Sequence, residues 1–447
     1  MIESAQTRYA RCQDGMSIAY QAVGDGPVDL MVTTGTLGNV EFIWEIPVVA
    51  EFLDRLAAIA RLLIYDRRGT GLSDRPSGST TMETGLDDML AVLDAVESEH
   101  AALLGFMDSG ATAALLAAQD PRRISALIWY LPTPRCAWAA DYPWGATQEQ
   151  FLGELKATED SWGSDAAVSA YFERDNPSLA ADPGLARQLA KAMRLTSSPA
   201  MALAAMRTWY ETDVRHVVSS IAVPTLVIDR DGAGPEEGEY TASLIPGCKR
   251  VVLPGADALP FLGDAASVVD AVREFLGVAR PVPELDRVLA TVLFTDVVGS
   301  TDKACEVGDA CWKELLEKHN AAVRALLTRY RGIEVKTTGD GFLATFDGPA
   351  RAVRCAQSIC EGVRSLDIEV RAGCHTGEIE LMGSDVGGVA VHIGARVGAL
   401  AGPSEVLVSS TVKDLVAGSG LAFEDRGEHE LKGVPDNWHL YALASAV

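Results

Sequence analysis

One short segment constrains the fold of this chain more than any motif, because it divides the chain into two parts. Residues 277–284 contain a glycine and two prolines, follow a helical pattern that ends near Leu276, and precede an apolar, strand-like run. Proline lacks the backbone N–H that a helix or a central strand needs, so neither element continues across this segment. A length of 447 residues also exceeds one ordinary hydrophobic core. We therefore predict a first domain over residues 1–277, a linker over 278–285 and a second domain over 286–447.

The composition is that of a soluble globular protein. Hydrophobic residues make up 48% of the chain, charged residues make up 22%, and the formal net charge is −24. Broad binding of nucleic acid or of an anionic membrane requires a basic surface, which this balance does not supply. The N-terminus has no apolar signal core, no apolar run is long enough to cross a bilayer, and the eight cysteines form no Cys-x-x-Cys pair. These features predict a cytoplasmic protein with reduced thiols, no membrane segment and no nucleic-acid partner.

The first domain alternates short apolar strands with helical patterns. This alternation predicts a parallel sheet that is covered by helices on both faces. Residues 132–216 break the alternation and carry four of the tryptophans, so we expect a helical cap there. The runs that we interpret as strands are residues 30–32, 61–65, 101–104, 225–228 and 250–253.

The second domain shows the order strand, helix, hairpin, helix, strand. Apolar residues at three- and four-residue spacing predict a helix over residues 312–330. Strand-like runs over 333–336 and 342–346 flank a Gly-Asp-Gly turn, which predicts a β-hairpin with the aspartate exposed at its tip. This order suits a compact α/β sandwich of the split-βαβ type.

Two aspartates of the second domain suggest metal-assisted phosphate chemistry. Asp296 closes one strand-like run, Asp340 lies in the hairpin turn, and both are followed by glycine or small residues. Two strand ends of one sheet can bring such carboxylates together, and hard divalent cations prefer oxygen ligands. Each aspartate taken alone is more often a helix cap or a turn residue, so the residues around them decide the interpretation.

Four further residues occur in order around these aspartates: Lys336, Asp385, Arg396 and Lys432. With them in place, the segment from about Leu285 to the C-terminus resembles the class III adenylyl cyclase catalytic domain. The resemblance implies a ferredoxin-like fold and a head-to-tail homodimer with active sites at the interface. It also implies that ATP is converted to 3′,5′-cyclic AMP and pyrophosphate.

The resemblance assigns a role to each matching residue. Asp296 and Asp340 match the metal-binding aspartates and would hold two Mg²⁺ or Mn²⁺ ions per site, with the Val297 carbonyl as an extra ligand. Lys336 and Asp385 match the pair that selects the purine. An ammonium donor suits adenine N1 and a carboxylate acceptor suits the 6-amino group, whereas guanine reverses both demands.

The remaining site residues lie on the C-terminal segments. Arg396 matches the arginine that stabilises the transition state, and Lys432 matches a lysine that contacts the terminal phosphates. His392 stands where the best-known members of the family have an asparagine that orients the ribose, so we expect a ribose or phosphate contact from it, the alternative being a packed helix residue. In the resemblance, the metal aspartates come from one subunit and the other residues from its partner.

The first domain resembles the α/β-hydrolase fold without its catalytic residues. Residues 66–74 match the Asp-x-Arg-Gly-x-Gly-x-Ser loop of that family, and Gly105 begins the expected nucleophile elbow. The small residues that an elbow requires are found only with Met107 at its centre, and a thioether cannot attack a carbonyl. Ala258 stands where the catalytic histidine is expected. We therefore predict a pseudo-hydrolase, and the whole chain resembles mycobacterial-type fusions of a hydrolase-like domain with a cyclase.

Several alternatives remain open. The first domain is either a scaffold or a sensor that binds a small apolar ligand beneath its cap. The chain as a whole could instead be a carboxylester hydrolase with a nucleotide-binding regulatory domain, a guanylyl cyclase, or a nucleotide sensor without activity. Lys336 and Asp385 argue against GTP, and the absence of a recognisable nucleophile argues against ester hydrolysis.

Overall fold

The computed structural model describes residues 6–33, 38–76, 78, 80–168, 175–278, 287–337, 339–382 and 385–444. Two compact units divide the chain, Met1–Glu284 and Leu285–Val447. The predicted linker over 278–285 lies outside the described residues except for its first residue. No helix in the described part of the chain combines the length and the apolar character that a membrane span requires.

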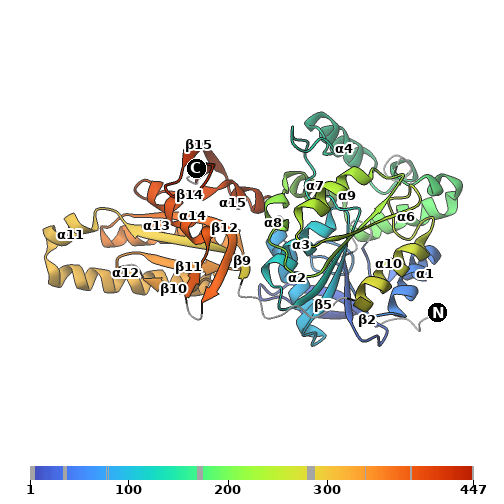
Figure 1. The fold of residues 1–447 in the computed structure, drawn as a ribbon, viewed down its shortest axis with the longest axis horizontal. Coiled ribbons are helices and arrows are strands. Elements are labelled where there is room, and N and C mark those ends of the chain that lie inside the picture. The colour runs from blue at the N-terminus through green and yellow to red at the C-terminus, as the bar shows by residue number, and fades with distance from the viewer. Residues whose placement is uncertain are drawn as a thin grey trace. The chain divides into compact units, whose positions relative to one another are not determined.

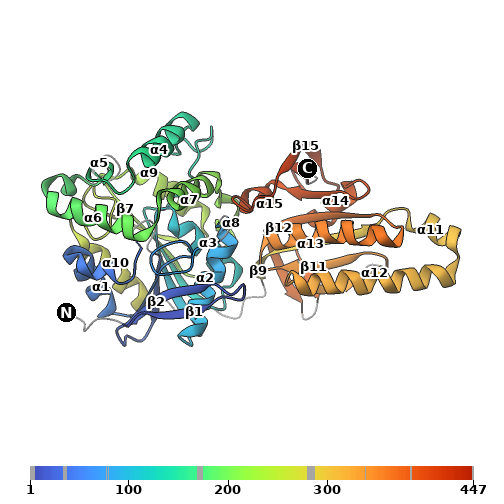
Figure 2. The same cartoon turned by 180° about the vertical axis from the view of Figure 1, so that it is seen from behind.

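An eight-stranded sheet forms the centre of the first unit, with the order β1-β2-β4-β3-β5-β6-β7-β8. The strands from β3 to β8 are parallel, and β1 and β2 add an antiparallel edge. Helices lie on both faces of the sheet, as predicted (Figures 1 and 2). Its strands are β1 (Arg8–Arg11), β2 (Ser17–Val23), β3 (Asp29–Thr33), β4 (Arg61–Tyr65), β5 (Ala101–Phe106), β6 (Ile124–Tyr130), β7 (Thr225–Arg230) and β8 (Lys249–Leu253).

Two helices of this unit begin with start signals that the sequence displays. Pro47 occupies the first turn of α1, where its missing N–H costs nothing. Thr81 and Thr84 form a reciprocal capping box at the start of α2. The sheet is flanked by η1 (Phe42–Glu45), α1 (Pro47–Ala57), α2 (Met82–Ala95), α3 (Ser109–Gln119), α9 (Pro235–Leu244) and α10 (Ala265–Val278).

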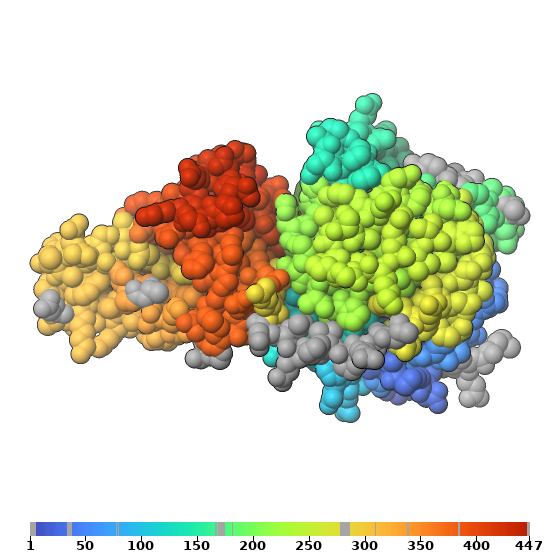
Figure 3. All heavy atoms as spheres, viewed as in Figure 1, coloured from blue at the N-terminus to red at the C-terminus, as the bar shows by residue number. Residues whose placement is uncertain are grey.

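A helical segment is inserted between β6 and β7, within the range where the sequence predicts a cap. Its helix α4 projects from the surface of the unit as the teal spheres of Figure 3. Stacked rings of Phe151 and Tyr210, 3.9 Å apart, join α4 to α7. The inserted helices are α4 (Gln148–Ser161), α5 (Asp165–Val168), η3 (Pro177–Ala181), α6 (Pro183–Thr196), α7 (Pro199–Glu211) and α8 (Arg215–Val218).

The second unit contains a mixed sheet with the order β10-β11-β9-β12-β14-β16-β15, and β13 pairs with β12. The central strands β9 and β12 are antiparallel over most of their lengths. The strands are β9 (Arg287–Val297), β10 (Ile333–Thr337), β11 (Phe342–Phe346), β12 (Val370–Met382), β13 (Asp385–Gly387), β14 (Val406–Ser409), β15 (Phe423–Glu430) and β16 (Asn437–Leu443).

Helices cover the two faces of this sheet in separate layers. Leu293 packs in the cluster that contains residues of α12 and α13, whereas its neighbour Val292 packs in the cluster that contains Ala390 of α14. This alternation follows from the two-residue period of a strand. The helices are α11 (Ser300–Val307), α12 (Asp309–Arg329), α13 (Pro349–Gly362), η4 (Val363–Leu366), α14 (Val389–Leu400) and α15 (Ser410–Leu415).

The structure confirms the predicted helix over 312–330 as α12 and the predicted hairpin as β10 and β11. No strand was predicted at β1, β2 or β6 in the first unit. In the second unit α11 was not predicted, and after β12 only a helix around His392 was considered. β1 is short and polar, and β15 carries charged residues along most of its length, so neither shows an apolar run.

Candidate active site

Asp296 and Asp340 lie at the same end of the second sheet. The register of β9 and β11 places Phe342 opposite Thr295, and the Phe342 N–H donates to the Thr295 hydroxyl at 3.2 Å. Asp296 follows Thr295 in one strand, and Asp340 precedes Phe342 by two residues in the antiparallel partner. Both aspartates are half-buried, so their carboxylates have access to solvent. This donor set of two partly exposed carboxylates at one sheet end fits a hard divalent cation.

Arg371 forms an ion pair with Asp296. No sequence motif indicated Arg371 as a site residue. The register of β12 and β9 sets Arg371 directly opposite Asp296. Its Nη2 and Nε donate to the same oxygen, Oδ2, at 2.5 and 3.0 Å. Its Nη1 donates to the Ala399 carbonyl at 3.3 Å, which fixes the guanidinium plane. The arginine therefore supplies positive charge beside the predicted metal site, and only the strand register could reveal it.

Lys336 and Asp385 form an ion pair on the surface of the same unit. The Lys336 ammonium donates to both carboxylate oxygens of Asp385, at 2.8 and 2.7 Å. The bond from Lys336, followed by one from the Val386 N–H, lowers the pKa of Asp385 below its ordinary value. Strand β13 carries Asp385 and pairs with β12, while Lys336 lies on β10. The fold thus brings together a donor and an acceptor that are far apart in the sequence.

Arg396 and His392 are exposed on α14, four residues apart, so they lie on the same face of the helix. The Arg396 Nε donates to the backbone carbonyl of Lys432 at 3.2 Å. This bond ties the loop before β16 to α14 and sets Lys432 near Arg396. Within the described residues, no hydrogen bond or ion pair connects either metal aspartate with these three residues or with the Lys336–Asp385 pair.

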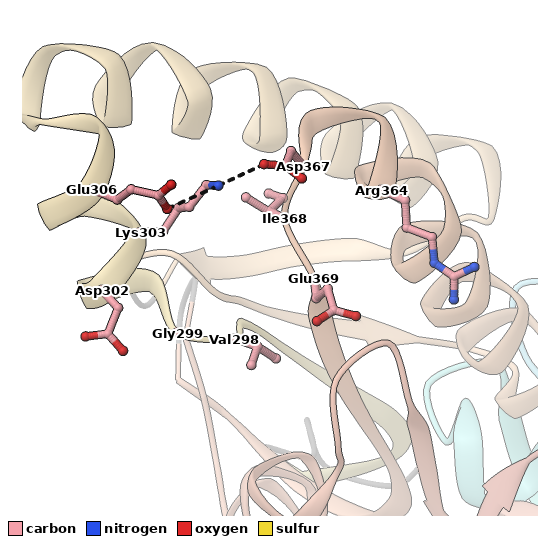
Figure 4. A pocket seen from close by; sticks show the side chains of 9 residues that line it. All are labelled: Val298, Gly299, Asp302, Lys303, Glu306, Arg364, Asp367, Ile368 and Glu369. Carbon is pink, nitrogen blue, oxygen red and sulfur yellow. Dashed lines mark hydrogen bonds and ion pairs between the residues drawn. The ribbon is translucent and has the colours of Figure 1, made fainter.

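A hollow of about 450 Å³ lies between α11 and the segment before β12 (Figure 4). Val298 and Gly299, which follow Asp296 and Val297 in the chain, form part of its wall. Lys303 of α11 reaches across it to Asp367 at 2.8 Å and also pairs with Glu306. The Lys303–Asp367 ion pair therefore links α11 to the segment before β12 across the hollow. None of the predicted site residues lines it.

Met107 of the first unit has the backbone conformation of a nucleophile elbow. Its φ is +47°, a left-handed value that non-glycine residues rarely adopt. A Cβ added at Gly105 would lie 2.4 Å from the Gly110 Cα, so the turn closes only with glycine there. The indole N–H of Trp129 donates to the Met107 carbonyl at 2.8 Å and supports the turn. The strained geometry is present, but the side chain at its tip is a thioether.

The other residues of a hydrolytic triad are also missing or engaged. Ser109, two residues after Met107 in the chain, is buried and donates to the Phe106 carbonyl at 2.7 Å, so it serves the turn itself. Asp229, at the end of β7, accepts from Arg250 at 2.6 Å. Ala258 and Met107 line the same cavity of about 300 Å³. Met107 and Ala258 therefore supply neither a nucleophile nor a base at these two positions, and Asp229 is paired with Arg250.

Comparison with known families matches both units. The model described as "alpha/beta hydrolase fold" matches residues 30–265, and the model "Adenylate and Guanylate cyclase catalytic domain" matches residues 283–445. The second unit is similar to "Putative adenylate cyclase 3" from Rhizobium meliloti (strain 1021), with 31% identity over 172 residues. That match covers 35% of this chain and 28% of the relative, so the chain spans less than a third of that protein's length.

The first unit is similar to enzymes of the hydrolase fold. "3-oxoadipate enol-lactonase 1" from Acinetobacter baylyi is 29% identical over 222 residues, which is 48% of this chain and 76% of the relative. Among solved structures, a bromoperoxidase from Bacillus anthracis gives a TM-score of 0.53 at 21% identity, covering 61% of this chain and all of that one. An enol-lactonase from Burkholderia xenovorans LB400 gives 0.51 at 22%, covering 60% of this chain and all of that one. These structural likenesses establish the fold alone.

Proposed function

Because the chain belongs to the α/β-hydrolase fold family and carries a C-terminal adenylate and guanylate cyclase catalytic domain, we propose that it is a metal-dependent adenylyl cyclase. Its product is 3′,5′-cyclic AMP, formed from ATP with release of pyrophosphate. The observation that carries the choice of ATP is the contact between the Lys336 ammonium and the Asp385 carboxylate. The first unit is non-catalytic and acts as a regulator or a scaffold.

The Lys336–Asp385 pair provides the polar groups that adenine needs. The ammonium can donate to N1, and the carboxylate can accept from the 6-amino group. Guanine presents a donor at N1 and an acceptor at position 6, so each side chain would face a group of the wrong kind. Because the pKa of Asp385 is lowered, its carboxylate is ionised and remains a hydrogen-bond acceptor at any physiological pH. The pair therefore favours ATP over GTP.

Asp296, Asp340 and the Val297 carbonyl would hold Mg²⁺ or Mn²⁺, two ions per site. Ions bound there lower the pKa of the ribose 3′-hydroxyl and neutralise the β- and γ-phosphates. Arg371 contributes before any ion arrives, because its two hydrogen bonds to one oxygen of Asp296 orient that carboxylate. It also places a fixed positive charge at the end of the sheet where the polyphosphate approaches.

Arg396 stabilises the charge that develops on the α-phosphate as the bond to pyrophosphate breaks. Its position on the rigid helix α14, with a bond to the Lys432 carbonyl, limits its freedom before substrate binds. Lys432 contacts the terminal phosphates, and His392 on the same face of α14 donates to the ribose or to a phosphate.

The active site is shared between two copies of the chain. In one copy, the metal aspartates make no polar contact with the purine pair or with Arg396 among the described residues. A second copy in head-to-tail arrangement would supply the missing half to each site. Met382 and Val389 are large apolar side chains that are exposed on either side of Asp385. A partner subunit that covers this region would remove them from water.

The direct test measures product from the purified full chain with ATP or GTP, each with Mg²⁺ or Mn²⁺. We expect cyclic AMP and pyrophosphate in equal amounts and a clear preference for ATP. Binding of ATP without turnover would identify a nucleotide sensor instead, and a preference for GTP would identify a guanylyl cyclase.

A complementation experiment tests the shared site separately. As homodimers, Asp340→Ala should be inactive and Lys336→Ala should retain about one hundredth of the activity or less. In a one-to-one mixture, half of the dimers are mixed and each of these retains one intact site, so about one quarter of the activity should return. If mixed dimers are demonstrated but remain inactive, the shared site is wrong while cyclase activity itself stands.

A further inference from the structure

The cavity at the Met107 elbow has an apolar wall and an acidic one. Met107, Leu131, Pro132 and Ala258 supply apolar surface, and three acidic residues, Asp175, Asp229 and Glu237, complete the lining. Among the described residues that line it, none is a lysine, an arginine or a histidine. The volume of about 300 Å³ suits a small organic molecule rather than a single water or ion.

Arg230 of β7 and Arg250 of β8 form their hydrogen bonds with protein groups. Arg230 is fully buried and donates to the Tyr130 hydroxyl and to the carbonyls of Pro254 and Asp264. Arg250 donates to Asp229 at 2.6 Å and to the Pro235 carbonyl at 2.6 Å. Neither guanidinium is available to a ligand. A carboxylate, such as the acid product of an ester, would therefore meet no compensating cation in the cavity.

Glu237 is an acidic residue of the lining for which the described residues show no cationic partner. Arg250 compensates Asp229, and Asp175 has polar interactions of its own. Glu237 accepts a hydrogen bond from the Tyr142 hydroxyl, and it makes no ion pair within the described residues. Burial raises the pKa of Glu237 to about 7. A positive charge beside Glu237 would stabilise the ionised form of its carboxyl group.

We propose that this cavity binds a small ammonium ligand with an apolar body, whose ammonium group pairs with Glu237. The apolar part lies against Met107 and Ala258, at the positions where a hydrolase would carry its nucleophile and its histidine. Because neither side chain can attack or transfer a proton, the ligand is bound and not converted. This inference concerns binding alone and does not depend on the proposed cyclase activity.

Three probes of matched shape test the proposal: benzylamine, benzyl alcohol and benzoate. Each is titrated calorimetrically into the full chain without nucleotide, at about pH 8, where the amine and Glu237 are both charged. We expect saturable binding of benzylamine, binding of the alcohol that is roughly tenfold weaker because it lacks the charge-assisted bond, and no binding of benzoate.

Glu237→Gln keeps the shape of the side chain and an acceptor for Tyr142, and it should weaken benzylamine about tenfold without changing benzyl alcohol. Glu236→Gln, at the exposed neighbouring position of α9, is the matched control and should leave all three probes unaffected. Ala258→Phe, which fills the cavity, should abolish binding of benzylamine. The proposal is overturned if the alcohol binds as tightly as the amine, if benzoate binds, if no probe saturates, or if Glu237→Gln binds benzylamine like the unaltered chain.

Discussion

The elbow of the first unit and the cyclase site of the second unit differ in what each has kept. At the elbow, the strained backbone is present, but the side chain at its tip is the Met107 thioether, and Ala258 lines the same cavity. In the second unit, charged side chains suited to nucleotide chemistry are present. Among the described residues of one chain, however, the metal aspartates make no polar contact with the purine pair or with Arg396. The comparison shows that site geometry and site chemistry depend on different parts of the sequence.

The physical reason lies in how each site is held. The left-handed turn at Met107 costs about 1–3 kcal/mol. It persists because the close approach of Gly105 to Gly110 and the hydrogen bond from Trp129 hold the backbone in this conformation. The cyclase residues are mostly exposed, and their ion pairs contribute little to folding. Packing therefore preserves the elbow with or without catalysis, whereas a single exposed substitution can remove the chemistry of the second site and leave its fold intact.

The largest expected effect tests this contrast at the metal site. Asp340→Asn should reduce cyclic AMP formation about a thousandfold or more, because an amide binds a divalent cation far less well than a carboxylate does. The thermal midpoint should change little, since the residue is half-buried in a turn. Asp302→Asn, an exposed acid of α11, is the control and should retain activity. Activity within tenfold of the unaltered chain for Asp340→Asn would place the metal elsewhere.

A smaller effect is expected at the purine pair. Lys336→Ala should lower kcat/KM for ATP by roughly a hundredfold. The substitution removes one charge-assisted contact with the base and leaves the Asp385 carboxylate without its partner. The loss for GTP should be smaller, so the preference between the two nucleotides should narrow. Lys318→Ala removes an exposed lysine of α12 that pairs with Glu314, and it should change neither value. An equal loss for ATP and GTP would mean that Lys336 acts on something other than the base.

The third prediction concerns the energetic cost of the acidic cavity. The pKa of Glu237 is raised to about 7 in the folded state, and its value in the unfolded state is 4.5. Glu237 therefore binds its proton more tightly when the chain is folded. The stability of the first unit should therefore fall as pH rises from about 4.5 to 7. Glu237→Gln removes this loss, which amounts to roughly 3 kcal/mol or several degrees in thermal midpoint.

The measurement compares the two proteins across that pH range, since ionisable groups that do not interact with Glu237 are common to both and cancel. Their thermal midpoints should agree below about pH 4.5 and separate above about pH 7, with Glu237→Gln the more stable. A constant difference at all pH values would mean that Glu237 does not titrate with folding.

The fold of each unit could be predicted from the sequence because its signals are local. Strand–helix alternation indicated the covered parallel sheet, and apolar spacing indicated α12 within a few residues. The requirement for small residues around an elbow singled out Met107, which the structure places at a positive φ. These features depend on residues that are neighbours in the chain, and the sequence displays them directly.

The contacts of Arg371 and Glu237 could not be predicted in the same way. Arg371 reaches Asp296 because of the register between β9 and β12, which joins residues 75 positions apart. Glu237 enters the cavity because α9 packs beside β7, and Tyr142 reaches it from a segment 95 residues earlier. No local pattern marks either residue as unusual. Charges that act through tertiary contacts require the fold before their partners can be named.

The smallest expected effect is the most direct test of the comparison. Met107→Ser places a hydroxyl on an elbow whose backbone is already correct, yet we expect turnover of p-nitrophenyl butyrate to stay at background. Ala258 offers no base to accept the serine proton, and Asp229 is held by Arg250, so the hydroxyl would remain un-ionised. Met107→Ala is the control for any change in the cavity itself. A tenfold or greater excess of Met107→Ser over Met107→Ala would reveal a base among residues that we regard as inert. Equal rates would show that a preserved strained turn, without a proton acceptor beside it, gives no catalysis.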